Sequence, residues 1–368
     1  MQAYPLKSIT IEEAMHLQFK LVDTITTVFQ GMDLLNRGDL GVNPELNQPQ
    51  TTRKAEEVIA KFFDAEDACF VRGAGTAAIR EALQSVFEEN RVVLVHTAPI
   101  YSTTQTTLET LNAQIVTCDY NNPQEIQETL RKHPEITVVL VQLTRQQLQD
   151  SYESSEVIRV IQEINPKIRI VTDDNYAVCK VHHIGVQQGA TLSCFSMFKL
   201  LGPEGIGCVV GQKEYISTIR QYHYSGGTQT QGWEALEALR GLVYAPVSLA
   251  IQAQQVEEIA KTLKHKVING IQDAVVVNAQ SKVVCVRFEE PIAAQVLELA
   301  PQFGAAPYPI GAESKYEIAP MFYRVSKTMI DSDPEFSLYW IRINPMRSGS
   351  QTVIRILEET LKVVRACS

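Results

Sequence analysis

From residue 51 onward the chain repeats one pattern, in which short runs of β-branched and apolar residues alternate with amphipathic stretches of helical periodicity. The apolar runs cover residues 91–95, 114–118, 136–143 and 168–174, and helical stretches such as 124–132 and 155–164 lie between them. Because the apolar residues in these runs are continuous and do not alternate with polar ones, both faces of the strands are expected to be buried. The pattern predicts a three-layer α/β domain in which helices cover both faces of a mainly parallel sheet.

The pattern changes toward the C-terminal end. Two apolar runs, residues 191–198 and 205–211, flank a Gly/Pro turn where the strand direction can change. A long helical stretch over residues 231–267 follows, and shorter strand and helix patterns come after it. We therefore expect an N-terminal segment (1–50) that packs on the small domain or a partner subunit, a large domain (51–240) and a smaller C-terminal α/β domain (241–368).

Composition excludes several classes of protein. Lys and Arg total 33 against 42 Asp and Glu, a net charge of −9, and no basic block favours nucleic-acid binding. No apolar run approaches the roughly 18 residues of a membrane span, and no signal peptide is visible. The seven cysteines are scattered without a C-x-x-C pair, which predicts reduced thiols and a cytoplasmic protein. His182 and His183 have no third residue at metal spacing, so we expect no metal site.

A glycine turn, G-x-G-x-x-A over residues 73–78, follows a strand pattern and begins a helix. A dinucleotide site would also need an acid at the end of the next strand, but that strand ends in His96. The turn is still expected to present free N–H groups to an anion; a tight turn with nothing bound is the alternative.

Two acids and a lysine follow at later strand ends. Asp173 and Asp174 end one strand, and because neighbouring side chains point to opposite sides, only one of them is expected to face a site. Lys199 follows the next strand within an S-x-x-K motif, but the S-D-N and K-T-G signatures of serine acyl-enzymes are missing. An apolar setting would favour the neutral, nucleophilic amine of Lys199; a salt-bridged lysine is the alternative.

Together, an anion cradle, a carboxylate and an amine match the needs of pyridoxal 5′-phosphate (PLP). The chain resembles fold-type I PLP enzymes of the aminotransferase and Cys/Met-lyase superfamily, and most closely the methionine γ-lyase-like (aluminium-resistance) group. The phrases that carry the resemblance are AEEVIAKFFDAEDACFVRGAGTAAI, VQLTRQQLQ, DDNYAV and SMFKLLGPEGIG. It implies the PLP-dependent transferase fold type I, a homodimer or homotetramer, and a site between the two domains that a neighbouring subunit completes.

The resemblance also implies a role for individual residues. Lys199 would be the Schiff-base lysine and the base at the α-carbon, and Asp173, with Asp174 as the alternative, would hold the ring nitrogen protonated. Tyr101 would stack on the ring. The other implied cofactor contacts are Ala74, Gly75, Thr76 and Ser196 at the phosphate, Gln142 and Tyr176 at the ring, and Thr228 at a partner's phosphate. Arg342, with Arg347 as its rival, would bind the substrate carboxylate, because a guanidinium can bind it through two hydrogen bonds.

The implied reaction begins when an amino acid replaces Lys199 in an external aldimine and loses its α-proton to give a carbanion. The subgroup favours a lyase that eliminates a β- or γ-substituent, with an aminotransferase as the alternative; a PLP-binding sensor or scaffold without turnover belongs to another class. The Y-S-R tripeptide of Cys/Met lyases is missing near residues 43–52, and Leu-Leu-Gly-Pro follows the lysine. Both departures weaken the prediction of elimination and leave that of the cofactor intact.

Overall fold

The computed structural model describes residues 2–145, 147–223, 225, 227–265, 268–279, 281–311 and 313–366. The chain forms two compact units. The larger unit comprises residues 12–144 and 152–246, and the smaller comprises residues 1–11, 145–151 and 247–368. Residues 12–50 thus belong to the larger unit, and the boundary within the long helix falls after Pro246.

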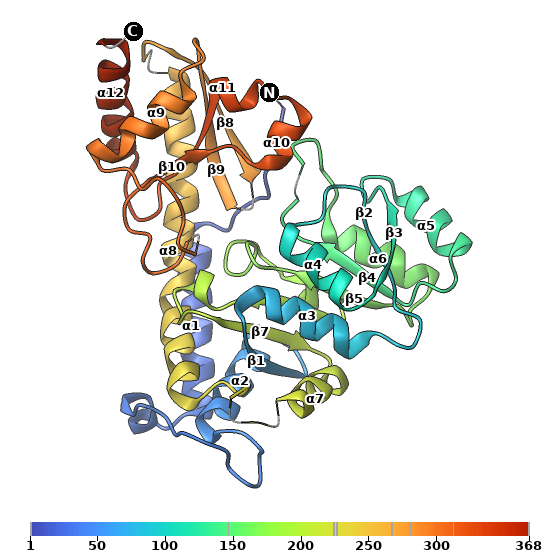
Figure 1. Cartoon of the computed structure of the whole chain (residues 1–368). Helices are drawn as coiled ribbons and strands as arrows, with labels where there is room; N and C mark the ends of the chain where they lie inside the picture. Colours follow the sequence, from blue (N-terminus) through green and yellow to red (C-terminus); the bar gives the residue numbers. More distant parts are fainter. Residues whose placement is uncertain are drawn as a thin grey trace. The chain divides into compact units, whose positions relative to one another are not determined.

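The larger unit contains a seven-stranded sheet in the order β1-β7-β6-β5-β4-β2-β3 (Figure 1). Its strands are β1 (Asp67–Arg72), β2 (Val92–His96), β3 (Gln114–Cys118), β4 (Val138–Gln142), β5 (Arg169–Asp173), β6 (Leu192–Ser196) and β7 (Ile206–Gly211). The pairings from β3 through β6 are parallel, as predicted. The direction changes at β7, which is antiparallel to both β6 and β1, so the predicted change at the Gly/Pro turn is confirmed.

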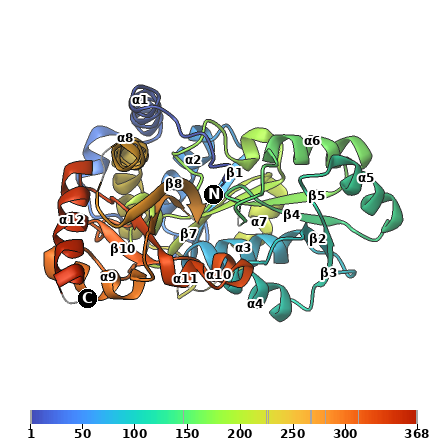
Figure 2. The same ribbon diagram turned by 90° about the horizontal axis from the view of Figure 1, so that it is seen from above.

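Helices cover both faces of this sheet, which gives the predicted three layers (Figure 2). One face packs against α3 (Ala74–Val86), α4 (Ser102–Thr110) and α7 (Lys213–Tyr222). The other face packs against α5 (Pro123–Lys132) and α6 (Ser154–Ile164). The central strands β4 and β6 are buried on both sides, because their apolar runs have no polar face. The expectation was wrong for residues 114–118: β3 lies at the end of the strand order, and only Cys118 of this strand is buried.

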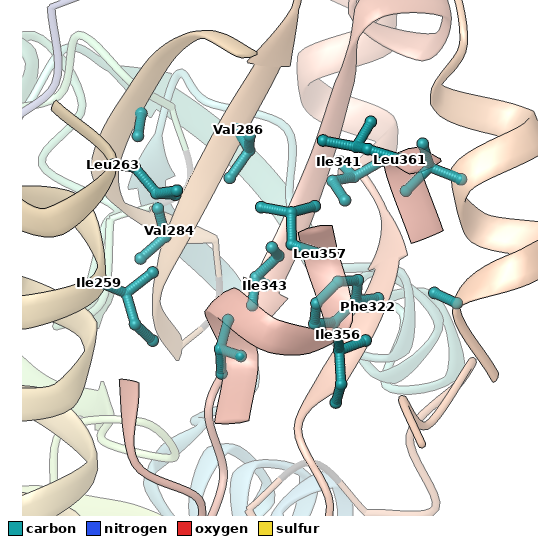
Figure 3. Packing of buried hydrophobic residues seen from close by; sticks show 14 of the residues in the cluster. Ile259, Leu263, Val284, Val286, Phe322, Ile341, Ile343, Ile356, Leu357 and Leu361 are labelled. Atoms are coloured by element: carbon teal, nitrogen blue, oxygen red, sulfur yellow. The ribbon is translucent and has the colours of Figure 1, made fainter. Parts of the chain in front are cut away.

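The smaller unit contains a four-stranded antiparallel sheet in the order β10-β11-β9-β8. Its strands are β8 (Ile271–Ala279), β9 (Ser281–Phe288), β10 (Met321–Arg324) and β11 (Trp340–Asn344). Its helices are α9 (Ala293–Leu299), α10 (Lys327–Ser332), α11 (Phe336–Tyr339) and α12 (Ser350–Ala366). Figure 3 shows the core of this unit, where Leu357 and Leu361 of α12 pack with Ile341, Ile343 and Phe322 of the sheet.

The remaining helices complete the two units. They are α1 (Ile11–Val28), α2 (Gln50–Phe62), the long α8 (Gly232–His265), and the 3₁₀ segments η1 (Gly31–Leu35), η2 (Gly185–Gln188), η3 (Phe198–Leu200) and η4 (Ala300–Phe303). Helix α8 continues through Pro246. Across the described residues, no helix combines the length and apolar character that a membrane crossing requires.

Candidate active site

The carboxyl end of β5 carries the two adjacent acids, and their side chains have different partners. Asp173, the last residue of β5, accepts two hydrogen bonds from Asn175 on Oδ1: one from the backbone N–H at 3.1 Å and one from Nδ2 at 2.8 Å. Burial raises the pKa of Asp173, and the bonds from Asn175 and the charge of Lys199 offset part of this rise. Asp173 is therefore the acid that lies within electrostatic reach of the lysine.

Asp174 faces a different set of groups. Its carboxylate accepts the Gly185 N–H at 3.0 Å and the Thr172 hydroxyl. The side chain is fully buried, and burial raises its pKa to about 6. Asp174 thus links the end of β5 to η2, and its side chain points away from that of Asp173, as expected for successive residues at a strand end.

Lys199 lies in η3, directly after β6. Its Nζ donates a hydrogen bond to the Tyr176 hydroxyl at 2.9 Å and lies 4.1 Å from the centre of that ring. Leu201 ends the turn at a φ of 63°, and the Gly202 N–H donates to the Met197 carbonyl. The structure therefore brings together three predicted residues, Lys199, Tyr176 and Asp173, from two neighbouring strand ends.

The glycine turn before α3 has a left-handed backbone and lies against the segment after β5. Gly73 adopts a φ of 111°, and a Cβ on Gly75 would lie 2.1 Å from Asn175 Oδ1, so the helix start packs directly against the segment after β5. The N–H of Ala74 donates to the Gly205 carbonyl at 2.9 Å. The Ala74 N–H is thus already used within the protein, which does not fit a phosphate contact from this group. The phosphate contacts from Gly75 and the exposed Thr76 stay predictions.

The other predicted ring and phosphate contacts lie at strand or helix ends. Gln142 ends β4 in register with Asp173, and its carbonyl accepts the Tyr152 hydroxyl at 2.6 Å. Ser196 ends β6 and is buried. Tyr101 precedes α4 with its side chain 40% exposed. The parallel register thus brings Gln142, Asp173 and Ser196 to one edge of the sheet.

The remaining predicted residues are Thr228 of the larger unit and the two arginines, Arg342 and Arg347, of the smaller unit. Thr228 is exposed in a turn, where its hydroxyl donates to the Ser225 carbonyl at 2.9 Å. Arg342 belongs to β11 of the smaller unit, donates from Nε to the Arg324 carbonyl at 2.8 Å and packs over the Tyr323 ring. Arg347, its rival, donates to Gln252 and to the Glu313 carbonyl in the same unit.

Sequence reasoning assigned no role to two groups near this edge. His96 ends β2, accepts the Tyr120 N–H on Nδ1 at 3.0 Å and lies beside the Tyr120 and Tyr152 rings. Asn175 lies within the DDNYAV phrase, and an amide two residues after an Asp is a signal for a local side-chain turn. Among the described residues, no group of three His, Cys, Asp or Glu side chains is placed to hold a metal, and His182 pairs with Glu13.

Two family profiles match the chain. The aminotransferase class-V family matches residues 43–238, and the YhfS-like C-terminal domain matches residues 257–357. Escherichia coli (strain K12) has a relative, called uncharacterized protein YhfS, that is 48% identical over 362 residues, covering 98% of this chain and 99% of the relative.

The chain belongs to the aminotransferase class-V family.

Solved structures agree with this family. The crystal structure of a pyridoxal-5′-phosphate-dependent protein, YhfS from Escherichia coli, matches with a TM-score of 0.96 and 47% identity, covering 99% of this chain and all of that one. A candidate cystathionine β-lyase involved in aluminium resistance, from Clostridium acetobutylicum, matches with a TM-score of 0.73 and 16% identity over 95% and 89% of the two chains. At that identity the second match shows the shared fold, and the predicted fold type I is confirmed.

Proposed function

We propose that this class-V family member binds PLP through Lys199 and cleaves a β- or γ-substituent from an amino acid, as a C–S lyase. The single observation that carries the proposal is the Lys199–Tyr176 contact beside Asp173, because an amine, a hydroxyl and a carboxylate converge at one sheet edge. PLP is the cofactor that such a set of groups serves. The PLP-dependent relative with 47% identity supports the same cofactor.

The residues at this edge fit PLP. A Cβ on Gly75 would collide with the Asn175 amide at 2.1 Å, so the start of α3 requires a glycine there, and the N–H groups of Gly75 and Thr76 would suit a phosphate dianion. Ser196, at the end of β6, would add a hydroxyl to that phosphate, and Asp173 would hold a proton on the ring nitrogen. When bound, PLP supplies an aldehyde for covalent attachment and a ring that takes up electrons from the bond being broken.

Each side chain then has a definite task. The Tyr176 hydroxyl accepts a hydrogen bond from Lys199 Nζ and so fixes the amine at the carboxyl edge of the sheet. In its neutral form this amine would remove the α-proton of the substrate and return a proton after the leaving group departs. Arg342, with Arg347 as its rival, would bind the α-carboxylate, because a guanidinium can hold a carboxylate through two hydrogen bonds.

Two measurements test the cofactor. The purified protein is expected to absorb as a bound PLP chromophore, and borohydride reduction followed by peptide mapping should find the cofactor on Lys199. Lys199→Ala should abolish the adduct, whereas Lys180→Ala should retain it, since Lys180 lies 5.3 Å from the same Tyr176 ring and is a matched local control. An adduct on any residue other than Lys199 would refute the assignment.

A second candidate, an aminotransferase, is favoured by the name of the family that matches residues 43–238. A panel of amino acids, assayed for keto-acid release with and without a keto-acid acceptor, separates the two. A lyase should release ammonia and keto acid without an acceptor, while an aminotransferase should need one. Spectral shifts with many ligands but no product would instead indicate a non-catalytic sensor.

We further propose that the protein acts as a homodimer or larger assembly in the cytoplasm. Met15, Phe19 and Val22 form an exposed apolar stripe on α1 at helical spacing, with 43%, 56% and 40% of each residue exposed. The six described cysteines are buried and form no disulfide, which is typical of a reducing compartment. Light scattering during size-exclusion chromatography should report at least twice the chain mass, and a monomer would refute the assembly.

A further inference from the structure

The side chain of Asn175 contacts two parts of the candidate site at once. Its Nδ2 donates to Asp173 Oδ1, and its Oδ1 lies where a Cβ on Gly75 would come within 2.1 Å. The Asn175 Oδ1 atom is buried and has no hydrogen-bond partner among the described residues. One amide group thus spans the carboxylate at the end of β5 and the turn that begins α3.

The hydrogen bonds from Asn175 are arranged asymmetrically on the Asp173 carboxylate. Both the backbone N–H and Nδ2 donate to Oδ1, so Asn175 leaves Oδ2 unused. The backbone bond forms a local side-chain turn that any residue at position 175 could retain. The Nδ2 bond depends on the amide, and it fixes the rotation of the carboxylate about its last bond.

The electrostatic environment of Asp173 makes the hydrogen bond from Asn175 Nδ2 important. Asp173 is only 8% exposed, and burial raises its pKa. The hydrogen bonds from Asn175 and the positive charge of Lys199 act in the opposite direction, while the neighbouring Asp174 is a second acid in the same segment. Donors to a buried carboxylate favour its ionised form, which is the form that can hold a protonated ring nitrogen.

We infer that Asn175 is a positioning residue, which orients Asp173 so that Oδ2 faces the cofactor ring nitrogen while its amide packs against the anion-binding turn at Gly75. This inference rests on the proposed PLP function. It assigns to Asn175 an effect, transmitted through Asp173, on the preference for a cofactor that has a ring nitrogen; its packing against Gly75 would affect cofactors with and without that nitrogen equally. The phosphate and the covalent bond to Lys199 are served by other residues.

The test compares two cofactors in binding titrations of the full-length apoprotein. One is PLP, and the other is its analogue with a C–H group in place of the ring nitrogen. The wild type should bind PLP more tightly than the analogue, because only PLP can use Asp173. Asn175→Ala should reduce this preference roughly tenfold, the usual effect of losing one hydrogen bond to a charged group. In an Asp173→Asn background, Asn175→Ala should change the preference no further.

A second variant covers a failure of Asn175→Ala to fold. Asn175→Leu keeps a side chain of similar size and shape against Gly75 but has neither an N–H₂ donor nor a charge, and it should also lose the preference for PLP. Asn165→Ala is the matched control, since it removes an amide that accepts the Lys167 N–H before the opposite end of β5, and it should keep the wild-type ratio.

The possible outcomes distinguish a failure of the proposed PLP function from a failure of the inferred role of Asn175. If the wild type prefers PLP and the Asn175 variants weaken both cofactors equally, Asn175 has only a structural role and the inference is overturned. If the wild type binds neither cofactor, the proposed function fails and the inference fails with it. A selective loss for PLP in the Asn175 variants, absent from Asn165→Ala, supports the inference.

Discussion

Replacement of Asp174 with asparagine is expected to raise the free energy of unfolding at pH 8 and to have a smaller effect at pH 4.5. Asp174 is fully buried, and burial raises its pKa from 3.8 to about 6, although the Thr172 hydroxyl and the Gly185 N–H partly offset this rise. An acid with a raised folded-state pKa stabilises the protein below its unfolded pKa. That contribution is lost as the pH rises through the folded pKa.

The structure sets the size of the effect. The shift from 3.8 to about 6 corresponds, at 1.36 kcal/mol per pKa unit, to about 3 kcal/mol of stability lost between low pH and pH 8. At pH 4.5 the folded carboxyl is mostly protonated, and only about 1 kcal/mol of that cost remains. The asparagine side chain cannot ionise and can still accept the Gly185 N–H. Its advantage should therefore be about 2 kcal/mol greater at pH 8 than at pH 4.5.

Urea unfolding at the two pH values measures this difference, with Asp67→Asn as the matched control. Burial alone would raise the pKa of Asp67, but hydrogen bonds and charges from Arg220 and Arg53 outweigh it and lower the pKa. Asp67 therefore contributes stability above its unfolded pKa, and this is lost as the pH falls through the folded value. Asp67→Asn should destabilise the protein at pH 8. An Asp174→Asn variant that is less stable than wild type at pH 8, or equally affected at both pH values, would refute the reasoning.

Two further substitutions test the packing. Gly75→Ala should weaken PLP binding at least tenfold in titrations, because the added Cβ meets the Asn175 amide at 2.1 Å. Gly31→Ala is the control, since a Cβ there meets nothing within 4 Å. Equal PLP binding by the two variants would contradict the predicted clash. Leu357→Ala should lower the free energy of unfolding by about 2–5 kcal/mol, since Leu357 is fully buried in the core of the smaller unit. Leu338→Ala, at a 51% exposed position, should change stability little in the same urea experiment, and a comparable loss in both variants would show that the core assignment is wrong.

The sequence predicted the sheet and the edge that carries the site because both depend on local patterns. Continuous apolar runs such as 138–141 can be buried only between two layers of helices, and this fixed the parallel α/β class. Parallel strands end at one edge, and the acids that end the run at 168–174 were expected at that carboxyl edge, whereas Gln142 and Ser196 were implied only by the resemblance. The register pairs Gln142 with Asp173 and Asp173 with Cys194, so β4, β5 and β6 end at the same edge.

Contacts between distant parts of the chain could not be predicted in this way. The Ala74 N–H donates to the Gly205 carbonyl, because β7 lies between β1 and β6 in the sheet. No local sequence pattern predicts that β1 pairs with β7. The ion pairs that Arg220 forms with Asp67 and Glu56 also join segments far apart in sequence. Such partners depend on strand order, which one sequence leaves open between several arrangements.

Asp173 and Asp174, the adjacent acids at the end of β5, have different hydrogen-bond partners and can therefore have different roles. Sequence reasoning predicted that Asp173 and Asp174 point to opposite sides, and the resemblance implied Asp173, with Asp174 as the alternative, at the ring nitrogen. The environments differ in kind: Asp174 is enclosed by donors from η2 and β5, and Asp173 receives both of its Asn175 bonds on one oxygen. A carboxylate whose oxygens are engaged in the fold serves as a structural link, whereas one held by a single oxygen remains able to bind a cationic ring nitrogen. Asn175 is the residue that holds Asp173 by one oxygen. Because the Asn175 amide also lies against Gly75, one side chain links Asp173 to the glycine turn.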